Sequence, residues 1–109
     1  MYRDKEKLKE ILNYTPHSIN IEGKEPMFSN GSARVNETAE IIDNLNGIDV
    51  ISKTLGAVEG LPNSVDNVFY VVSLIVAQAL PLRKDLLIPG ELLRDEKGAI
   101  VGCKNLCRM

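Results

Sequence analysis

Residues 68–95, VFYVVSLIVAQALPLRKDLLIPGELLRD, are the most informative segment of this chain for predicting its fold. Ten of the twelve residues from 68 to 79 are apolar, and charged residues, prolines and a glycine are concentrated between 81 and 95. This is the pattern of a buried scaffold that presents a polar loop. We therefore expect the core in the first half of the stretch and the binding residues in the second.

The apolar half predicts a central strand followed directly by a short helix. Residues 67–72 contain an unbroken apolar run, which is typical of a strand buried on both faces. Better helix formers follow, with Ser73 placed to act as the N-cap and Pro81 to stop the helix. A strand that enters a helix in this way directs backbone N–H groups toward one point, where an anion can bind.

A long hairpin is predicted before this stretch. Residues 33–42 and 48–58 are extended segments, and Asn46-Gly47 between them is the strongest hairpin signal in the chain. Gly56 indicates a bulge in the second arm. Such a long hairpin needs a sheet to join, because otherwise it exposes an edge.

The remaining segments complete an α+β prediction. Leu8, Ile11 and Leu12 share one face of a helix over residues 2–12, which is too short to be stable alone and should dock on the domain or on another subunit. Asn13 would cap its end. We expect a mainly antiparallel sheet with this N-terminal helix and the short helix after the central strand. The other predicted elements are strands at 18–22, 25–28, 90–94 and 99–106, a loop at 83–89 and a turn at 95–98.

Length and charge restrict the class of protein. The 109 residues fit a single domain, 1–109, with 44% hydrophobic and 26% charged residues. A formal charge of −2 gives no basic field for DNA, an RNA polymer or an anionic membrane, although a few arginines suffice for a small anion. The charged N-terminus and the lack of a membrane-length apolar run predict a cytoplasmic protein.

Catalytic and metal signatures are missing from the sequence. His17 is the single histidine, and no nucleophile elbow, phosphate loop or zinc-binding spacing is present. Cys103 and Cys107 lack the further ligands that zinc needs and are expected to be free structural thiols. We therefore predict no catalytic residue, no metal and no cofactor.

Several arginines favour a binding site for phosphate and purine groups. Arginine presents a planar fork to phosphate oxygens and also stacks on bases. An aromatic residue of the central strand could stack a purine, although the core is the ordinary place for it. The plainer alternative for the charged residues is a set of surface ion pairs. The candidate ligand-binding residues are Arg34, Phe69, Ser73, Arg83, Asp85, Arg94 and Asp95.

Three segments together resemble a known family. They are LNYTPHSINI at 12–21, ARVNETAEII with VEGLP between 33 and 62, and FYVVSLIVAQALPLRKDLLIPGELLRDEKGAIVGCKNL at 69–106. The chain is similar in these motifs to the phage anti-defence proteins that counter the Thoeris system. It departs from their pattern at Tyr14, where leucine is frequent, and in the charged residues before it.

The resemblance implies a sponge protein. Such proteins bind a cyclic ADP-ribose isomer without cleaving it, and some also bind the cyclic oligonucleotides of CBASS defence. The family implies a homodimer or homohexamer, and its R-x-D and R-D motifs correspond to Arg83, Asp85, Arg94 and Asp95. Arg34, Phe69 and Ser73 come from the chemistry of the residues alone. Two alternatives are a structural or interaction protein of a virion or prophage, and a cyclic-nucleotide phosphodiesterase.

Overall fold

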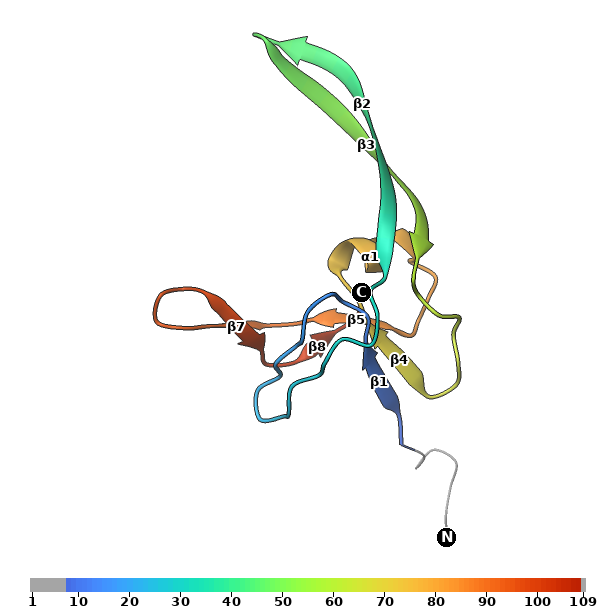
Figure 1. Ribbon diagram of the computed structural model, residues 1–109, viewed down its shortest axis with the longest axis vertical. Helices are drawn as coiled ribbons and strands as arrows, with labels where there is room; N and C mark the ends of the chain where they lie inside the picture. Colours follow the sequence, from blue (N-terminus) through green and yellow to red (C-terminus); the bar gives the residue numbers. More distant parts are fainter. Residues whose placement is uncertain (1–7, 109) are drawn as a thin grey trace.

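The computed structural model describes residues 8–108 and consists mostly of β-strands with one short helix (Figure 1). The predicted combination of many strands with a short helix after the central strand is therefore confirmed. The elements are β1 (Glu10–Asn13), β2 (Arg34–Leu45), β3 (Ile48–Glu59), β4 (Val68–Val71), α1 (Leu74–Ala79), β5 (Leu86–Pro89), β6 (Leu92–Arg94), β7 (Ile100–Cys103) and β8 (Leu106–Cys107).

The central sheet is mixed, with strand order β1-β4-β5-β8. β1 and β5 both pair parallel to β4, and only β8 pairs antiparallel, with β5. The central position of β4 is confirmed, but the prediction of a mainly antiparallel sheet is wrong for this sheet. The reason lies in α1, which provides the crossover that two parallel strands such as β4 and β5 need. Antiparallel pairing dominates the two hairpins, β2–β3 and β6–β7.

The N-terminal helix prediction is wrong where the structure describes it. Residues 1–7 lie outside the described residues, and β1 occupies Glu10–Asn13. The Glu10 amide donates to the Asn67 carbonyl at 2.8 Å, and Leu12 packs against the core. Pairing with β4 therefore outweighs the local helical spacing of Leu8, Ile11 and Leu12, because a helix this short gains little by itself.

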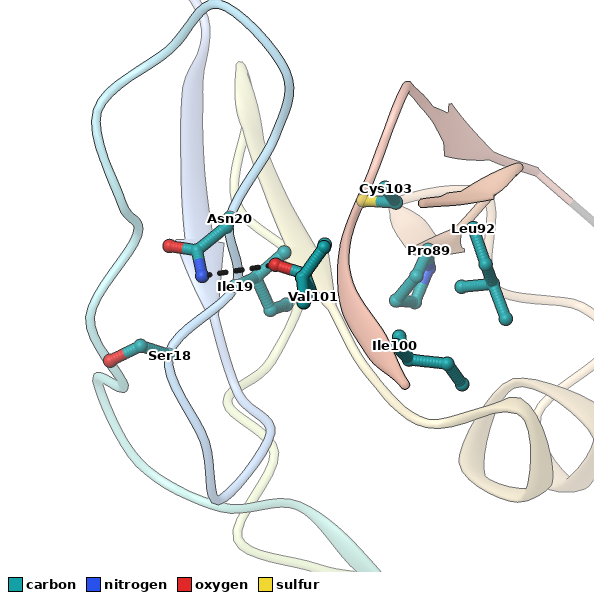
Figure 2. A pocket seen from close by; sticks show the side chains of 9 residues that line it. Ser18, Ile19, Asn20, Pro89, Leu92, Ile100, Val101 and Cys103 are labelled. Carbon is teal, nitrogen blue, oxygen red and sulfur yellow. Dashed lines mark hydrogen bonds between the residues drawn. The ribbon is translucent and has the colours of Figure 1, made fainter. Parts of the chain in front are cut away.

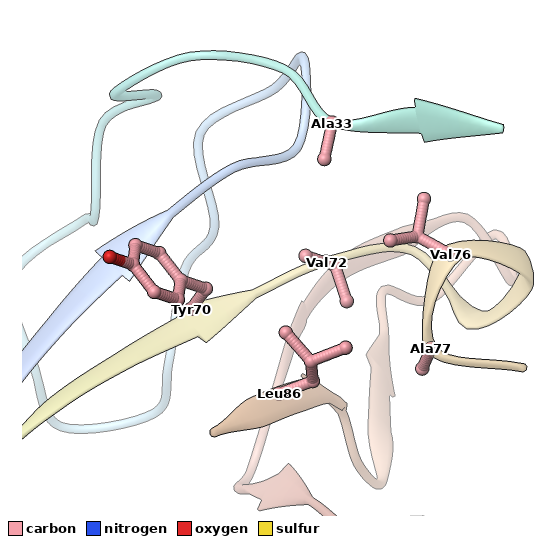
Figure 3. Close-up of a cluster of buried hydrophobic side chains, with 6 residues drawn as sticks. All are labelled: Ala33, Tyr70, Val72, Val76, Ala77 and Leu86. Carbon is pink, nitrogen blue, oxygen red and sulfur yellow. The ribbon is translucent and has the colours of Figure 1, made fainter. Parts of the chain in front are cut away.

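β4 supplies the centre of two hydrophobic clusters on opposite faces of the sheet. Tyr70 and Val72 belong to one cluster and Val71 to the other, as the alternation of a strand requires. Val71 and Val72 are fully buried, and each contributes about 1.5 to 3 kcal/mol to folding. The larger cluster lies between β4, β5, α1 and the start of β2 (Figure 3). Its members are Ala33, Tyr70, Val72, Val76, Ala77 and Leu86.

β2 and β3 form the predicted hairpin, which extends from the body of the protein as an arm (Figure 1). Asn46 and Gly47 have φ values of 53° and 84°, as a type I′ turn requires. The register shift opposite Asn36 confirms the bulge at Gly56. Within residues 8–108 the two strands pair only with each other, so the sheet that this hairpin was expected to join is not provided by the described chain.

Several predicted strands and loops differ from the structure because contacts with distant parts of the chain determine their conformation. The predicted strand at 18–22 is reduced to isolated bridges from Ile19 to Met27 and from Ile21 to Cys103. Residues 86–89, predicted as loop, form β5 because β4 offers them a parallel partner. The last predicted strand is split into β7 and β8. The turn at 95–98 is confirmed, with Gly98 at φ 84°.

Asn13 organises the connection that follows β1. It is fully buried, and its side-chain amide donates to the carbonyls of His17 (2.7 Å) and Met27 (3.0 Å). Its side-chain oxygen accepts from the amide and the hydroxyl of Thr15 at 2.9 and 2.6 Å. Asn13 therefore ends a strand and fixes a loop, whereas the sequence predicted that it would cap a helix.

Candidate functional site

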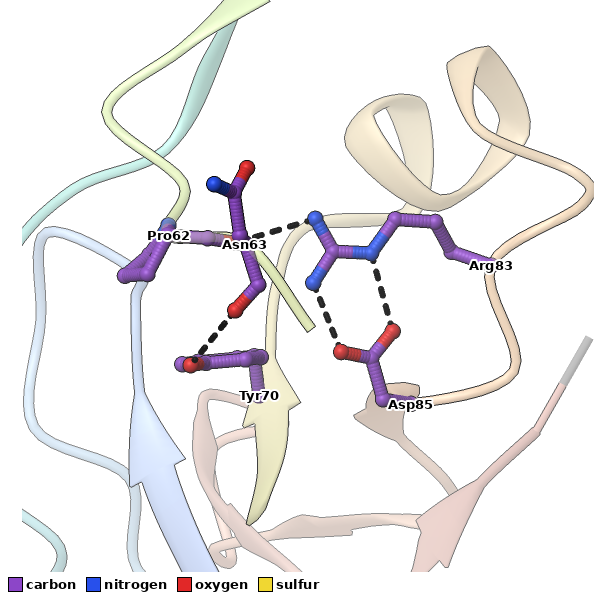
Figure 4. Close-up of polar contacts among 5 residues, drawn as sticks. All are labelled: Pro62, Asn63, Tyr70, Arg83 and Asp85. Carbon is purple, nitrogen blue, oxygen red and sulfur yellow. Dashed lines mark hydrogen bonds and ion pairs between the residues drawn. The ribbon is translucent and has the colours of Figure 1, made fainter. Parts of the chain in front are cut away.

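Arg83 and Asp85 form a bidentate ion pair in the segment immediately before β5 (Figure 4). Arg83 Nε donates to Asp85 Oδ1 at 2.9 Å, and Arg83 Nη2 donates to Asp85 Oδ2 at 2.6 Å. The other terminal nitrogen, Nη1, donates to the Pro62 carbonyl at 3.0 Å. Arginine has five N–H donors, so one N–H on each terminal nitrogen has no partner within the described residues. We call the Arg83–Asp85 pair the clamp. It holds two segments of the chain together, and Arg83 can still donate hydrogen bonds to a ligand.

The ion pair shifts the pKa of both partners. The hydrogen bonds from Arg83 lower the pKa of Asp85 against the opposing effect of burial, and the polar side chain of Ser64 lowers it further. The same pair raises the pKa of Arg83. Both groups are therefore charged at neutral pH, and Asp85 is a poor proton acceptor there.

Tyr70 lies beneath the clamp and connects it to the core. The Arg83 guanidinium carbon is 5.7 Å from the centroid of the Tyr70 ring, and the Tyr14 ring meets Tyr70 edge-on at 5.3 Å. The Tyr70 hydroxyl donates to the Asn63 carbonyl at 3.4 Å (Figure 4). A buried aromatic residue thus fixes the orientation of the arginine.

An open groove of about 600 Å³ lies beside this clamp. Phe69 of β4 forms part of its wall, and the Arg108 guanidinium carbon is 5.8 Å from the centroid of the Phe69 ring. Three cationic side chains and one aromatic ring therefore share one groove. The lining residues are Ser64, Val65, Asp66, Asn67, Val68, Phe69, Leu82, Arg83, Lys84, Asp85 and Arg108.

Three of the seven predicted site residues, Phe69, Arg83 and Asp85, line this groove. They come together because β4 and β5 are neighbours in the central sheet, so that the Tyr70 amide donates to the Asp85 carbonyl at 2.8 Å. Lys84 and Arg108 also line the groove but were not predicted. Lys84 lies inside the R-x-D motif and could have been found there, whereas Arg108 belongs to no motif.

The other four predicted residues lie elsewhere in the chain. Arg34 is exposed at the start of β2, opposite Glu59 of β3. Ser73 is the N-cap of α1 as predicted, but its side chain makes no capping hydrogen bond. Arg94 is the last residue of β6, and Asp95 begins the turn between β6 and β7.

Arg94 and Asp95 both make hydrogen bonds within the β6–β7 hairpin. Arg94 Nη1 donates to the Gly98 carbonyl at 2.8 Å. Asp95 Oδ1 accepts from the amides of Lys97 and Ala99 at 2.8 and 3.0 Å. These contacts give Arg94 and Asp95 a structural role in the hairpin and do not bring them to the groove at Phe69.

A smaller cavity of about 250 Å³ lies between residues 18–20 and the β6–β7 hairpin (Figure 2). Asn20 and Val101 both line this cavity, and Asn20 Nδ2 donates to the Val101 carbonyl at 3.3 Å. Its other lining residues are Ser18, Ile19, Pro89, Leu92, Ile100, Gly102 and Cys103. No charged side chain is among them, so this cavity is chemically unsuited to a phosphate. The groove at Phe69 is the better candidate.

Comparisons with family models, curated proteins and solved structures gave no match for this chain. Among residues 8–108, no group of three or more His, Cys, Asp or Glu side chains is arranged to hold a metal ion. In the same part of the chain, no helix has the length and apolar character to cross a membrane. Cys103 is buried and Cys107 exposed, both as free thiols.

Proposed function

We propose that this protein binds a cyclic ADP-ribose-type signalling nucleotide in the Phe69 groove and sequesters it without cleavage. The observation that carries the proposal is the position of the Arg108 guanidinium over Phe69, beside Arg83 and Lys84. A purine can stack on an aromatic ring or an arginine plane, and a pyrophosphate pairs with arginine and lysine. The groove combines both requirements.

The groove chemistry favours binding over turnover. Hydrolysis needs a group that can take up and release a proton near neutral pH. Asp85 is held as a carboxylate by Arg83, which lowers its pKa, and the single histidine, His17, is not among the groove residues. A ligand held there would be retained chemically intact. The role against Thoeris defence in the host cytosol, and a further affinity for CBASS oligonucleotides, follow from the family resemblance.

The proposal is tested by recovering the ligand from a denatured complex. The full chain is incubated with the cyclic ADP-ribose isomer, separated from free ligand and denatured, and the released compound is identified by mass spectrometry. We expect intact ligand in stoichiometric amount. No retained ligand, or a hydrolysed product, would contradict the proposal.

Substitutions then locate the site. Phe69→Ala should weaken binding by about 1 to 3 kcal/mol through lost stacking, and Arg108→Ala by about 1.5 to 3 kcal/mol through lost charged hydrogen bonds. Arg94→Ala is the matched control, because it removes an exposed arginine whose contact is with Gly98. If Arg94→Ala weakens binding and Arg108→Ala does not, the ligand binds at the β6–β7 turn.

A second candidate function is a structural or interaction protein of a virion or prophage. The exposed apolar residues of the β2–β3 arm favour it, since large apolar patches mark interaction sites. Co-purification of the protein with virions, with no nucleotide retained from a defence-activated lysate, would support this candidate over sequestration.

A further inference from the structure

The β2–β3 arm exposes more apolar surface and more open strand edge than its own fold uses. Six large apolar side chains on the arm are between 40% and 69% exposed: Ile41, Ile42, Leu45, Ile48, Ile51 and Leu55. Within residues 8–108, the outer edges of β2 and β3 pair with no further strand. An edge of this kind is a template for pairing with another chain.

We propose that the arm is an interface with a second copy of this chain, formed by antiparallel pairing of the two β3 edges about a two-fold axis at Ile51. In this register Ile51 faces the partner's Ile51, Asp49 faces the partner's Lys53, and Lys53 faces the partner's Asp49. The sequence of β3 is thus complementary to itself in charge. Opposite charges directly across a strand pair stabilise it, and a two-fold axis repeats each contact.

The same register joins the apolar residues of the two arms. Ile51 already lies opposite Ile41 within one chain, and Lys53 lies opposite Ala39. Side chains at 49, 51 and 53 share one face of β3 because successive residues alternate. A four-stranded sheet would therefore carry a continuous row of four isoleucines, Ile41 and Ile51 from each copy, between two Asp–Lys pairs.

β3 is a better edge for this pairing than β2. The register shift at Ile42 breaks the β2 ladder within its apolar part, whereas the irregularity of β3 is at Gly56, beyond the paired segment. β2 also carries three acidic residues, Glu37, Glu40 and Asp43, and a single basic residue, Arg34, at its start. Its edge is therefore not complementary to itself in charge. This inference does not depend on the proposed nucleotide site.

The first test uses complementary charge changes in the full chain. Asp49→Lys places Lys opposite Lys in both pairs, and Lys53→Asp places Asp opposite Asp. Each variant alone should self-associate about tenfold more weakly or worse than the unsubstituted protein, measured as molar mass by light scattering over a dilution series. An equimolar mixture of the two variants should recover the dimer, because both lysines of one chain then face aspartates of the other. Recovery of the dimer in the mixture also shows that the weakened self-association of each variant is not caused by misfolding.

The second test fixes the register by crosslinking. In a Cys107→Ser background, Ile51→Cys should form an intermolecular disulfide under mild oxidation, because directly opposite residues have Cα atoms about 4.5 to 5.5 Å apart. Thr54→Cys is the control, since the two copies of residue 54 would be about 20 Å apart, six residues of strand. A monomeric unsubstituted protein, failure of the mixed variants to recover the dimer, or equal crosslinking at 51 and 54 would each overturn the proposal.

Discussion

The guanidinium of Arg83 holds the carboxylate of Asp85 through two hydrogen bonds of 2.9 and 2.6 Å. Its third hydrogen bond, to the Pro62 carbonyl, ties the segment before β4 to the segment before β5. One side chain therefore fixes two walls of the groove. The remaining N–H groups of Arg83 are the ones that a bound phosphate would use.

Removal of the clamp should destabilise the fold. Arg83→Ala leaves the mostly buried Asp85 carboxylate without its partner, and we expect a loss of about 1 to 3 kcal/mol in the free energy of unfolding, measured by urea denaturation. Lys84→Ala is the matched control, because Lys84 is the exposed neighbouring cation, and it should change stability by less than about 0.5 kcal/mol. Equal effects of the two substitutions would show that the clamp contributes nothing.

Stability should also fall in acid because of the same pair. The pKa of Asp85 is lowered in the folded state by its hydrogen bonds to Arg83. The resulting stabilisation is complete above the unfolded pKa of about 3.9 and is lost as pH falls through the lower, folded value. Urea midpoints from pH 7 to pH 3 should therefore fall less steeply for Asp85→Asn than for the unsubstituted protein. Parallel curves would contradict the role of this pair.

Asn13 is expected to be among the most sensitive polar positions. Asn13→Ala leaves the amide of Thr15 and the carbonyl of Met27 without side-chain partners in a part-buried site, and should cost about 2 to 4 kcal/mol of stability. Asn20→Ala removes one exposed hydrogen bond of 3.3 Å and should cost less than about 0.5 kcal/mol. Thermal unfolding of the two variants under the same conditions measures the difference, and similar melting temperatures would refute the expectation.

Gly60 combines a left-handed backbone with a close contact. Its φ is +85°, and an added Cβ would collide with the Ser32 carbonyl oxygen. Gly23 has a similar φ of +78° but open space around it. Gly23→Ala should therefore report the backbone cost alone, about 1 to 2 kcal/mol, and Gly60→Ala should cost at least about 1 kcal/mol more in urea denaturation. Equal losses would mean that the Ser32 carbonyl moves freely aside.

Part of the candidate site was predictable because its residues are close in sequence. Arg83 and Asp85 are two residues apart and follow the apolar run, so their pairing and their position next to the core could be read directly. Arg108 could not be placed in this way. It reaches Phe69 through the course of the chain after β8, and no local pattern specifies that course. The separation of Arg94 from the groove likewise follows from the direction of the β6–β7 hairpin.

Local signals were sufficient to predict several elements of this fold. The Asn46-Gly47 turn, the apolar strand β4 and the helix between Ser73 and Pro81 each depend on backbone preferences within a few residues. Local signals did not predict that Glu10–Asn13 is a strand, that β5 pairs parallel to β4 or that Asn13 is buried. Hydrogen bonds between residues far apart in the chain make those choices, and the free energy they contribute exceeds the weak local preference of a short segment.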